Sequence, residues 1–257
     1  MRRSVVPEIT GPRLHLVESW SETLGNGIGS DGPAKVEIRC TEKADGDLSI
    51  DSDADRLDAN RRQIVDRPWI WLRQVHGNRV VVVSDSANPD ELDAILGTEA
   101  DAIVTRRDDV ALAVQSADCA TIALWSDDGV IGAVHAGWRG LEADVVGATV
   151  DAMRSMGAET IHARTGPCIG VECYEFGATE LRRMVALFGP EVVGRSAEGN
   201  DALDVRRAVS LSLARSGVDH AGGSSRCSAC QPHELWSHRS RNEKQRQALV
   251  VWIGHDE

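Results

Sequence analysis

The amino-acid sequence predicts an α/β protein of the α+β type, a single domain of mixed β-sheets flanked by helices. Its 257 residues can bury a substantial core, and the proportions of apolar (42%) and charged (26%) residues exclude general disorder. Short β-branched runs alternate with longer amphipathic patterns, as in proteins that combine sheets with helices. No internal repeat or clear linker divides the chain, which favours one domain.

Six segments are predicted to be strands because they are apolar or β-branched and of strand length. An Asp127-Asp128-Gly129 turn predicts that two of them form a hairpin. The strands are expected at residues 79–84, 110–115, 120–125, 130–135, 160–164 and 247–253.

Three helices are predicted from apolar residues at helical spacing, each closed by a glycine. The first begins at Gly140 and is closed by Gly157. The second and third cover residues 178–188 and 203–216.

The first part of the chain differs in texture from the rest. Residues 1–66 are expected to be an acidic, variable N-terminal part of the same domain, and residues 67–257 its core. Residues 25–32 are predicted to be a glycine-rich loop. Residues 45–58 carry six aspartates, which is typical of a solvated surface, and their spacing fits no Ca²⁺ loop.

Charge and apolar runs restrict the class of protein. The 28 basic and 40 acidic residues give a net charge of −12, which argues against nucleic acid or an anionic membrane as a partner. The longest apolar runs are far shorter than the roughly 20 residues of a membrane helix. Two arginines near the start are followed by no apolar stretch, so the expected location is cytoplasmic. Six cysteines are too sparse for a disulfide scaffold and are expected to be thiols or metal ligands.

Three short motifs place polar side chains beside small residues near predicted strand ends, where α/β folds build their sites. Alone, each histidine is more typical of a structural or surface residue, and the cysteine of a small core residue. Together, His76, Cys119 and His135 suit Zn²⁺ with an open fourth position, the arrangement of catalytic zinc. The motifs are Gln74-Val75-His76-Gly77-Asn78, Ser116-Ala117-Asp118-Cys119 and Val134-His135-Ala136-Gly137-Trp138-Arg139-Gly140.

With Ala100-Asp101-Ala102 and Gly166-Pro167-Cys168-Ile169-Gly170, these motifs occur in an order that resembles a known family. Its members were first described as multicopper polyphenol oxidases or laccase-domain proteins. They are now generally regarded as purine nucleoside phosphorylases with adenosine deaminase activity. The resemblance runs from about Trp69 to Ile253, and residues 135–140 are its most specific part. It implies a zinc ion on His76, Cys119 and His135, with copper as the alternative metal.

The resemblance implies phosphorolysis of adenosine, inosine, guanosine and methylthioadenosine, and hydrolytic deamination of adenosine. The partners are then purine nucleosides and phosphate. Deamination needs a metal-activated water that attacks C6 of the purine, which zinc supplies near neutral pH. Phosphorolysis needs cations that hold phosphate against C1′ while the ribose gains oxocarbenium character. We expect one zinc ion per chain.

Three residues are candidates for roles in catalysis. Cys119 belongs to the metal centre. Arg139, near a predicted helix N-terminus, is expected to hold phosphate, with a salt bridge or a strand–helix brace as the alternative. Asp118 is expected either to orient a ligand, to act as a general base or to support its neighbour Cys119.

One segment departs from the family pattern. Ahead of an Asn-Arg pair, here Asn60-Arg61, the family typically has Asn-Leu-Gly. This chain has Asp47-Leu48-Ser49 and then a slightly shorter, more acidic segment. Residues 41–59 therefore carry no predicted substrate contact.

Several alternatives stay open. Cys168, Cys173, Cys227 and Cys230 admit a structural Cys₄ zinc site or a redox CxxC, although partly buried thiols are favoured. Arg239 is a candidate phosphate contact, and Cys40 is interpreted as a bystander at a strand end.

Two other function classes compete with the phosphorylase. A copper-dependent polyphenol oxidase is disfavoured because the chain has only eight histidines, none in a His-x-His pair. The other is a non-enzymatic zinc-binding module, including a role in peptidoglycan precursor quality control that is sometimes linked to the family. The sequence specifies neither the preferred nucleoside nor the oligomeric state.

Overall fold

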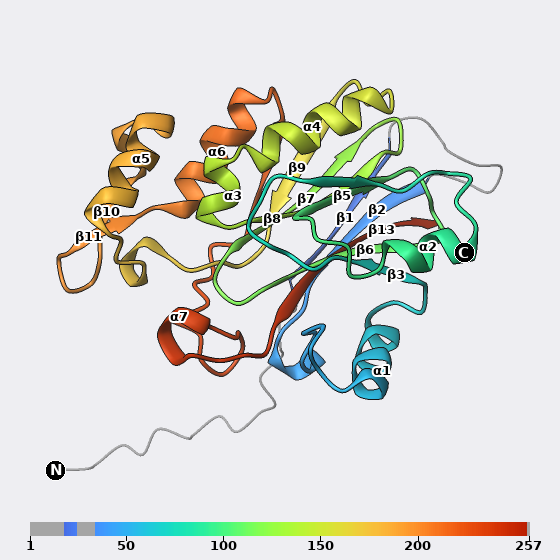
Figure 1. Cartoon of the computed structure of the whole chain (residues 1–257), viewed down its shortest axis with the longest axis horizontal. Helices are drawn as coiled ribbons and strands as arrows, with labels where there is room; N and C mark the ends of the chain where they lie inside the picture. Colours follow the sequence, from blue (N-terminus) through green and yellow to red (C-terminus); the bar gives the residue numbers. More distant parts are fainter. Residues whose placement is uncertain (1–17, 25–33, 256–257) are drawn as a thin grey trace, which may run out of the picture.

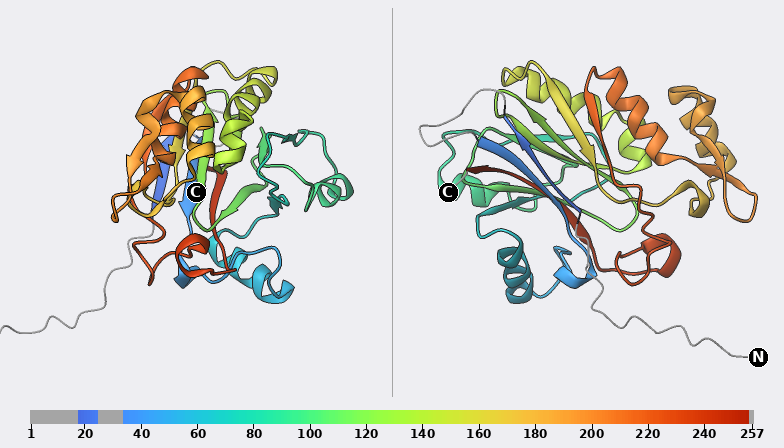
Figure 2. Two further views of the ribbon diagram at one scale, coloured as in Figure 1. Left: turned by 60° about the vertical axis from the view of Figure 1, so that its left-hand side comes forward. Right: turned by 180° about the vertical axis from the view of Figure 1, so that it is seen from behind.

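Two β-sheets packed face to face form the centre of the protein (Figures 1 and 2). The computed structural model describes residues 18–24 and 34–255. In spatial order, the five-stranded sheet contains β1 (Ser19–Thr23), β2 (Ala34–Cys40), β13 (Gln247–His255), β6 (Ala111–Ser116) and β3 (Trp69–Trp71). The six-stranded sheet contains β12 (Asp219–Gly223), β9 (Ile161–Thr165), β7 (Ala120–Ser126), β8 (Ile131–Ala136), β5 (Ala102–Thr105) and β4 (Val80–Val82).

Both sheets are mixed. Within them, only the β3–β6, β4–β5 and β9–β12 pairs are parallel. A separate antiparallel pair is formed by β10 (Val193–Arg195) and β11 (Asp201–Leu203).

The helices lie mainly on the outer faces of the sheets (Figure 1). A group of four covers the six-stranded sheet, and α1 packs against the opposite side of the five-stranded sheet. The helices are α1 (Ala54–Ile64), α2 (Pro89–Ile95), α3 (Trp138–Glu142), α4 (Val145–Ser155), α5 (Ala178–Phe188), α6 (Val205–Arg215) and α7 (His238–Arg241). Short 3₁₀ turns are η1 (Lys43–Asp45), η2 (Val171–Cys173) and η3 (Pro190–Val192).

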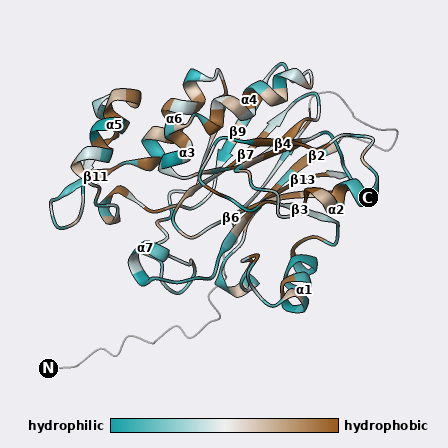
Figure 3. Ribbon diagram, in the orientation of Figure 1, coloured by the Kyte–Doolittle hydropathy of each residue, from teal (hydrophilic) through white to brown (hydrophobic). Residues whose placement is uncertain are grey.

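The alternation of side chains along β13 shows how one strand serves two cores. Leu249 and Val251 face the six-stranded sheet, whereas Ala248 and Val250 face the α1 side. Because both faces are covered, the central strands are apolar on both sides, as the hydropathy colouring shows (Figure 3).

The predicted fold class is confirmed, and the ends of all six predicted strands lie within two residues of those observed. The strand expected at 79–84 is shorter, Val80–Val82. The helix expected at 178–188 is also observed, whereas the one expected at 203–216 begins at Val205, after β11. The loop expected at 25–32 lies outside the described residues.

The single helix predicted from Gly140 to Gly157 is wrong. The chain forms two helices, α3 and α4, because Asp144 adopts a left-handed conformation (φ 63°) and caps α4 through the N–H of Gly147.

The interpretation of residues 45–58 as a solvated surface holds only in part. Asp45 pairs with Arg39 at 2.6 Å, and Asp53 accepts a hydrogen bond from the N–H of Arg56 and so caps α1. In the described part of the chain, no helix is long and apolar enough to span a bilayer.

Candidate metal centre and cleft

The candidate site lies where the chain crosses between the two sheets. His76 lies between β3 of one sheet and β4 of the other, and Cys119 lies between β6 and β7. His135 is near the end of β8, which is antiparallel to β7 and pairs with it through Thr121. The topology therefore brings the end of β8 to the start of β7, beside both crossings.

The loop that carries His76 is built around the buried carboxylate of Asp101. The backbone N–H groups of Val75, His76 and Gly77 donate to it at 3.1, 2.9 and 2.7 Å. His76 has φ of 61°, a left-handed conformation that lets successive N–H groups converge on one anion. Gln74 fixes the start of this loop through two hydrogen bonds with the backbone of Gln115.

Asp101 also contacts the second histidine. Its Oδ1 lies 2.8 Å from Nδ1 of His135, so the other ring nitrogen, Nε2, is left for a ligand. Burial raises the pKa of Asp101, but hydrogen bonds from His135 and from the backbone lower it by more. The net pKa is therefore below its usual value. One ionised carboxylate thus orients both histidines.

Cys119 completes the group. Its Sγ lies 3.8 Å from Nε2 of His76, and the rings of His76 and His135 are 4.9 Å apart at 78°. Burial raises the pKa of the Cys119 thiol, but the charge of His135 and hydrogen bonds from both histidines outweigh it and lower the pKa. Burial likewise lowers the pKa of His135, while Cys119 and Asp101 raise it above its usual value. The protein alone therefore favours a thiolate beside an imidazolium.

Two glycines of the third motif, Gly137 and Gly140, are required because the loops that carry His76 and Cys119 lie close to their Cα atoms. A Cβ on Gly137 would lie 2.9 Å from Cδ2 of His76 and 3.0 Å from Sγ of Cys119. A Cβ on Gly140 would lie 3.2 Å from the carbonyl oxygen of Gly77. Side chains here would push the ligand loops apart.

The structure brings together the three residues that the sequence predicts as ligands. One ligand atom from each of His76, Cys119 and His135 lies within 4.8 Å of the other two. Two imidazoles and a thiolate suit Zn²⁺, and three protein ligands leave a fourth position for water or substrate. Because His76 is exposed and Cys119 is partly exposed, that position faces the cleft described next.

A cleft of about 610 Å³ opens over the three ligands, within the size range of small-molecule sites. Its basic side chains include Arg73, Arg139 and Arg239, and its aromatic ones are Trp138 and Tyr174. This local excess of positive charge contrasts with the net charge of −12 and suits an anionic ligand.

Arg139 is exposed, and its guanidinium lies 4.3 Å from the ring centroid of Trp138. Among the described residues, no carboxylate lies within ion-pair distance of it, which disfavours the salt-bridge alternative. Helix α3 has only one turn, so the charge of the guanidinium, rather than the helix dipole, would attract an anion.

Both carboxylate oxygens of Asp118 are already bonded. Ser228 donates its hydroxyl to Oδ1 and Arg239 donates its backbone N–H to Oδ2, each at 2.6 Å. Asp118 has φ of 107°, an uncommon conformation for an aspartate. These contacts favour a positioning role over that of a general base.

Comparisons with known proteins identify the family of the chain. The profile of the family described as multi-copper polyphenol oxidoreductase laccase matches residues 39–254. The chain belongs to this family. The protein named purine nucleoside phosphorylase ORF3 from Streptomyces griseus is 38% identical over 188 residues, covering 72% of this chain and 74% of that protein. A purine nucleoside phosphorylase from Xylella fastidiosa (strain 9a5c) is 33% identical over 254 residues, covering 95% and 89%.

Solved structures of similar proteins show the shared fold. Bacillus licheniformis hypothetical protein YfiH matches with a TM-score of 0.74 at 23% identity, covering 86% of this chain and 93% of that one. YlmD from Geobacillus stearothermophilus matches with a TM-score of 0.72 at 23% identity, covering 91% and 100%.

In this member of the laccase family, the segment that departs from the family pattern lines the cleft. Asp47, Ser49 and Asp51 are among its lining residues. The carboxylate of Asp47 accepts hydrogen bonds from the backbone of Ser49 and Arg246 and from the hydroxyl of Ser52. The first part of the segment, residues 47–52, is therefore an ordered wall of the site, whereas most of residues 53–59 are exposed.

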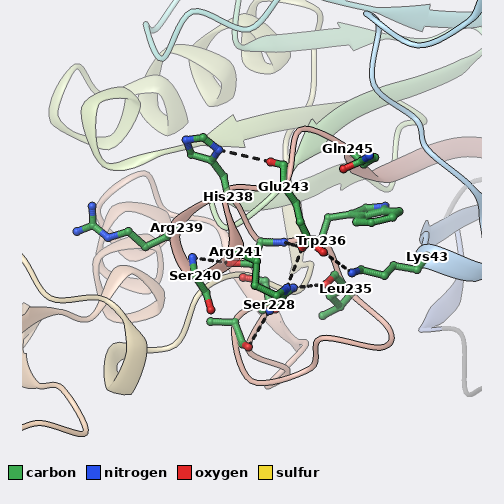
Figure 4. A network of polar contacts seen from close by, with 12 residues as sticks. Lys43, Ser228, Leu235, Trp236, His238, Arg239, Ser240, Arg241, Glu243 and Gln245 are labelled. Atoms are coloured by element: carbon green, nitrogen blue, oxygen red, sulfur yellow. Dashed lines mark hydrogen bonds and ion pairs between the residues drawn. The ribbon is translucent and has the colours of Figure 1, made fainter.

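An adjoining wall is formed by the chain around α7, which polar contacts hold in place (Figure 4). Arg241 donates to the carbonyl groups of Ser228 and Leu235, and Glu243 pairs with Lys43 at 2.6 Å. Arg239 points away from these contacts (Figure 4). Its guanidinium donates to the carbonyl of Glu175 at 2.5 Å, so it is partly engaged.

Sequence reasoning missed the roles of Asp101, Arg73 and Gly137. Asp101 appeared only as part of a motif. A signal was present, since an aspartate between Ala100 and Ala102 at the start of an apolar strand is buried only if it is bonded. Arg73 directly precedes the first motif, and its position in the cleft depends on the fold.

Proposed function

We propose that this protein is a zinc-dependent purine nucleoside phosphorylase that acts on adenosine, inosine, guanosine and methylthioadenosine and also deaminates adenosine. The observation that carries the proposal is the His76, Cys119 and His135 group at the base of a basic, aromatic-lined cleft. The relatives from Streptomyces griseus and Xylella fastidiosa, named purine nucleoside phosphorylases, support it.

Zinc held by His76, Cys119 and His135 would supply a Lewis acid and a water activated near neutral pH. The chain's own residues would do the rest. Asp101 keeps Nδ1 of His135 engaged and fixes the His76 loop, so both imidazoles present a lone pair in one direction.

Phosphorolysis forms a bond from a phosphate oxygen to C1′ and breaks the bond from C1′ to the purine nitrogen, giving the free base and ribose-1-phosphate. The exposed guanidinium of Arg139 and Arg73, which also lines the cleft, would hold the phosphate dianion there. Trp138 and Tyr174 offer apolar faces against which the purine would stack.

A polyphenol oxidase is not favoured, although the family's description names copper. Among the described residues, the cluster at the cleft joins two of the chain's eight histidines to one cysteine. A multicopper oxidase needs a blue-copper site and a separate cluster with many more imidazoles.

The test is chromatographic. Purified protein is incubated with adenosine, with and without phosphate, and adenine, ribose-1-phosphate and inosine are measured. We expect adenine and ribose-1-phosphate only when phosphate is present. Inosine should form in both cases, and phosphate should convert part of it to hypoxanthine and ribose-1-phosphate. His76→Ala should lose both products, while His233→Ala, a change at an exposed histidine outside the cleft, should keep them. Absence of adenine in the presence of phosphate would reject the phosphorylase.

A further inference from the structure

A second group of metal-ligating side chains lies outside the cleft. It consists of Glu172, Cys173, Cys227 and Cys230, and one ligand atom from each lies within 4.8 Å of the others. The Cys₄ alternative that the sequence left open is not what the structure shows. Cys168 is absent from the group, and the carboxylate of Glu172 takes the fourth place.

We infer that these four residues form a second, structural zinc site. Three thiolates and one carboxylate provide a closed four-ligand set of the kind that structural zinc prefers. Binding would remove the protons of the three thiols. The inference does not depend on the proposed enzymatic function.

The distances match a tetrahedral ion better than a disulfide. Two sulfurs bound to one zinc at about 2.3 Å stand roughly 3.8 Å apart, whereas a disulfide needs about 2.05 Å. The Sγ atoms of Cys173 and Cys230 are 3.4 Å apart, and Sγ of Cys230 is 3.4 Å from Oε1 of Glu172. Shifts of a few tenths of an ångström would suffice for coordination.

The surroundings also suit a bound metal. The backbone N–H of Gly170 donates to Sγ of the buried Cys227 at 3.1 Å, a contact that stabilises a thiolate. The guanidinium of Arg206 donates to the carbonyl groups of Cys168 and Arg226, the latter directly before Cys227. This positive charge would offset part of the net charge of −2 of a Zn²⁺ ion with three thiolates and a carboxylate.

The second site would brace the wall of the cleft. Its ligands come from two segments, the η2 turn with Cys173 and the loop from Cys227 to Cys230. Tyr174, which lines the cleft, follows η2, and Ser228 in the loop bonds Asp118. A metal joining the two segments would therefore fix the positions of Tyr174 and Asp118 relative to each other without contacting a substrate.

The test is the metal content and spectrum of the whole chain, purified under reducing conditions. We expect two zinc ions per chain in the wild type, one in Cys230→Ser and one in His76→Ala. Cys173→Ser, also outside the buried core, is a second variant of the same site. Cys40→Ser, which removes a cysteine outside both groups, should keep two.

Cobalt substitution separates the two sites without an activity assay. The second site would contribute three thiolates and the cleft site one, so Cys230→Ser should lose most of the thiolate-to-cobalt absorbance and His76→Ala little. Cys230→Ser should also melt at a lower temperature. A single zinc ion in the reduced wild type, lost in His76→Ala and kept in both Cys230→Ser and Cys173→Ser, would overturn the inference. Because the protein is kept reduced, a disulfide that Cys173 and Cys230 could form in air does not affect this outcome.

Discussion

Nδ1 of His135 lies 2.8 Å from Oδ1 of Asp101, and the same carboxylate accepts the backbone N–H of His76 at 2.9 Å. Two of the three candidate ligands are therefore oriented by one buried side chain. Because His76 lies on a crossing between the sheets and His135 lies near the end of β8, their relative position depends on this contact.

Asp101→Asn should weaken metal binding at the cleft by roughly 10- to 100-fold. The carboxylate now offers two acceptor oxygens to four N–H groups, three from the backbone and one from the His135 ring, whereas an amide offers only one. It should also lower the free energy of unfolding by about 2–4 kcal/mol. Chelator competition and chemical denaturation measure the two effects. Asp85→Asn, at an exposed aspartate, is the control. Unchanged metal affinity in Asp101→Asn would show that the histidines are positioned by other contacts.

Cys119 should be protected from alkylation while metal is bound and should react readily after chelation, because it is partly exposed and its pKa is lowered by His135. Cys40 is 3% exposed, and burial raises the pKa of its thiol, so it should stay unmodified in the folded protein. Mass spectrometry of alkylated peptides compares the two. Cys119→Ser should lose the cleft metal and the activity, and Cys40→Ser should keep both. Equal loss in the two variants would contradict the site.

The sequence predicted the central strands well because they are apolar on both faces. Strands β7 and β8 are buried along their whole length, so a continuous apolar run identifies them. Strands β1, β2 and β12 were missed since exposed or half-buried residues alternate along them. Strands β3, β5, β10 and β11 were missed because they have only three or four residues. The pairing of β2 with β13 joins opposite ends of the chain, and local patterns do not specify such a contact.

The candidate ligands were predicted from short motifs, but the residue that orients the two histidines, Asp101, was not. His76, Cys119 and His135 each sit beside a glycine or at a strand end, which local patterns record. The role of Asp101 depends on the His76 loop and the end of β8, which meet only in the folded protein. The second cluster shows the same limit, since spacing suggested Cys168, whereas the η2 turn places Glu172 with the three cysteines.

Glu243→Gln should destabilise the protein in a pH-dependent way. Burial raises the pKa of Glu243, but Lys43, the backbone N–H of Ser237 and Arg241 lower it more, to below its usual value. A carboxyl group whose pKa is lowered in the folded protein stabilises it at pH values above the ordinary pKa of the group. This stabilisation is lost as the pH falls through the pKa of the folded state. The variant should therefore lose about 1–2 kcal/mol of unfolding free energy at pH 7.

That difference should shrink as the pH falls below about 4.5, the ordinary value for this group. Denaturation at pH 7, 5 and 3.5 measures it, with Glu198→Gln at an exposed position as the control. A difference that stays constant with pH would show that the carboxylate charge is not responsible.

Arg139→Ala separates the two proposed reactions. Phosphorolysis uses phosphate, whereas deamination uses water, so only the first needs a cation that holds an anion. Loss of one charge-assisted contact of about 1.5–3 kcal/mol should raise the KM for phosphate roughly 10- to 100-fold, whereas inosine formation at saturating adenosine should fall much less. The melting temperature should hardly change, because Arg139 is exposed and its guanidinium lies over the ring of Trp138.

Arg183→Ala is the matched control for this change. Arg183 also lies over Trp138, at 5.9 Å, and pairs with Glu142, but it does not line the cleft. Removing it should leave the KM for phosphate unchanged. If Arg139 were instead a brace between β8 and α3, its replacement would lower both activities together with the melting temperature. Both products and the melting temperature measured on one preparation decide the matter, and parallel loss of all three would reject the phosphate role.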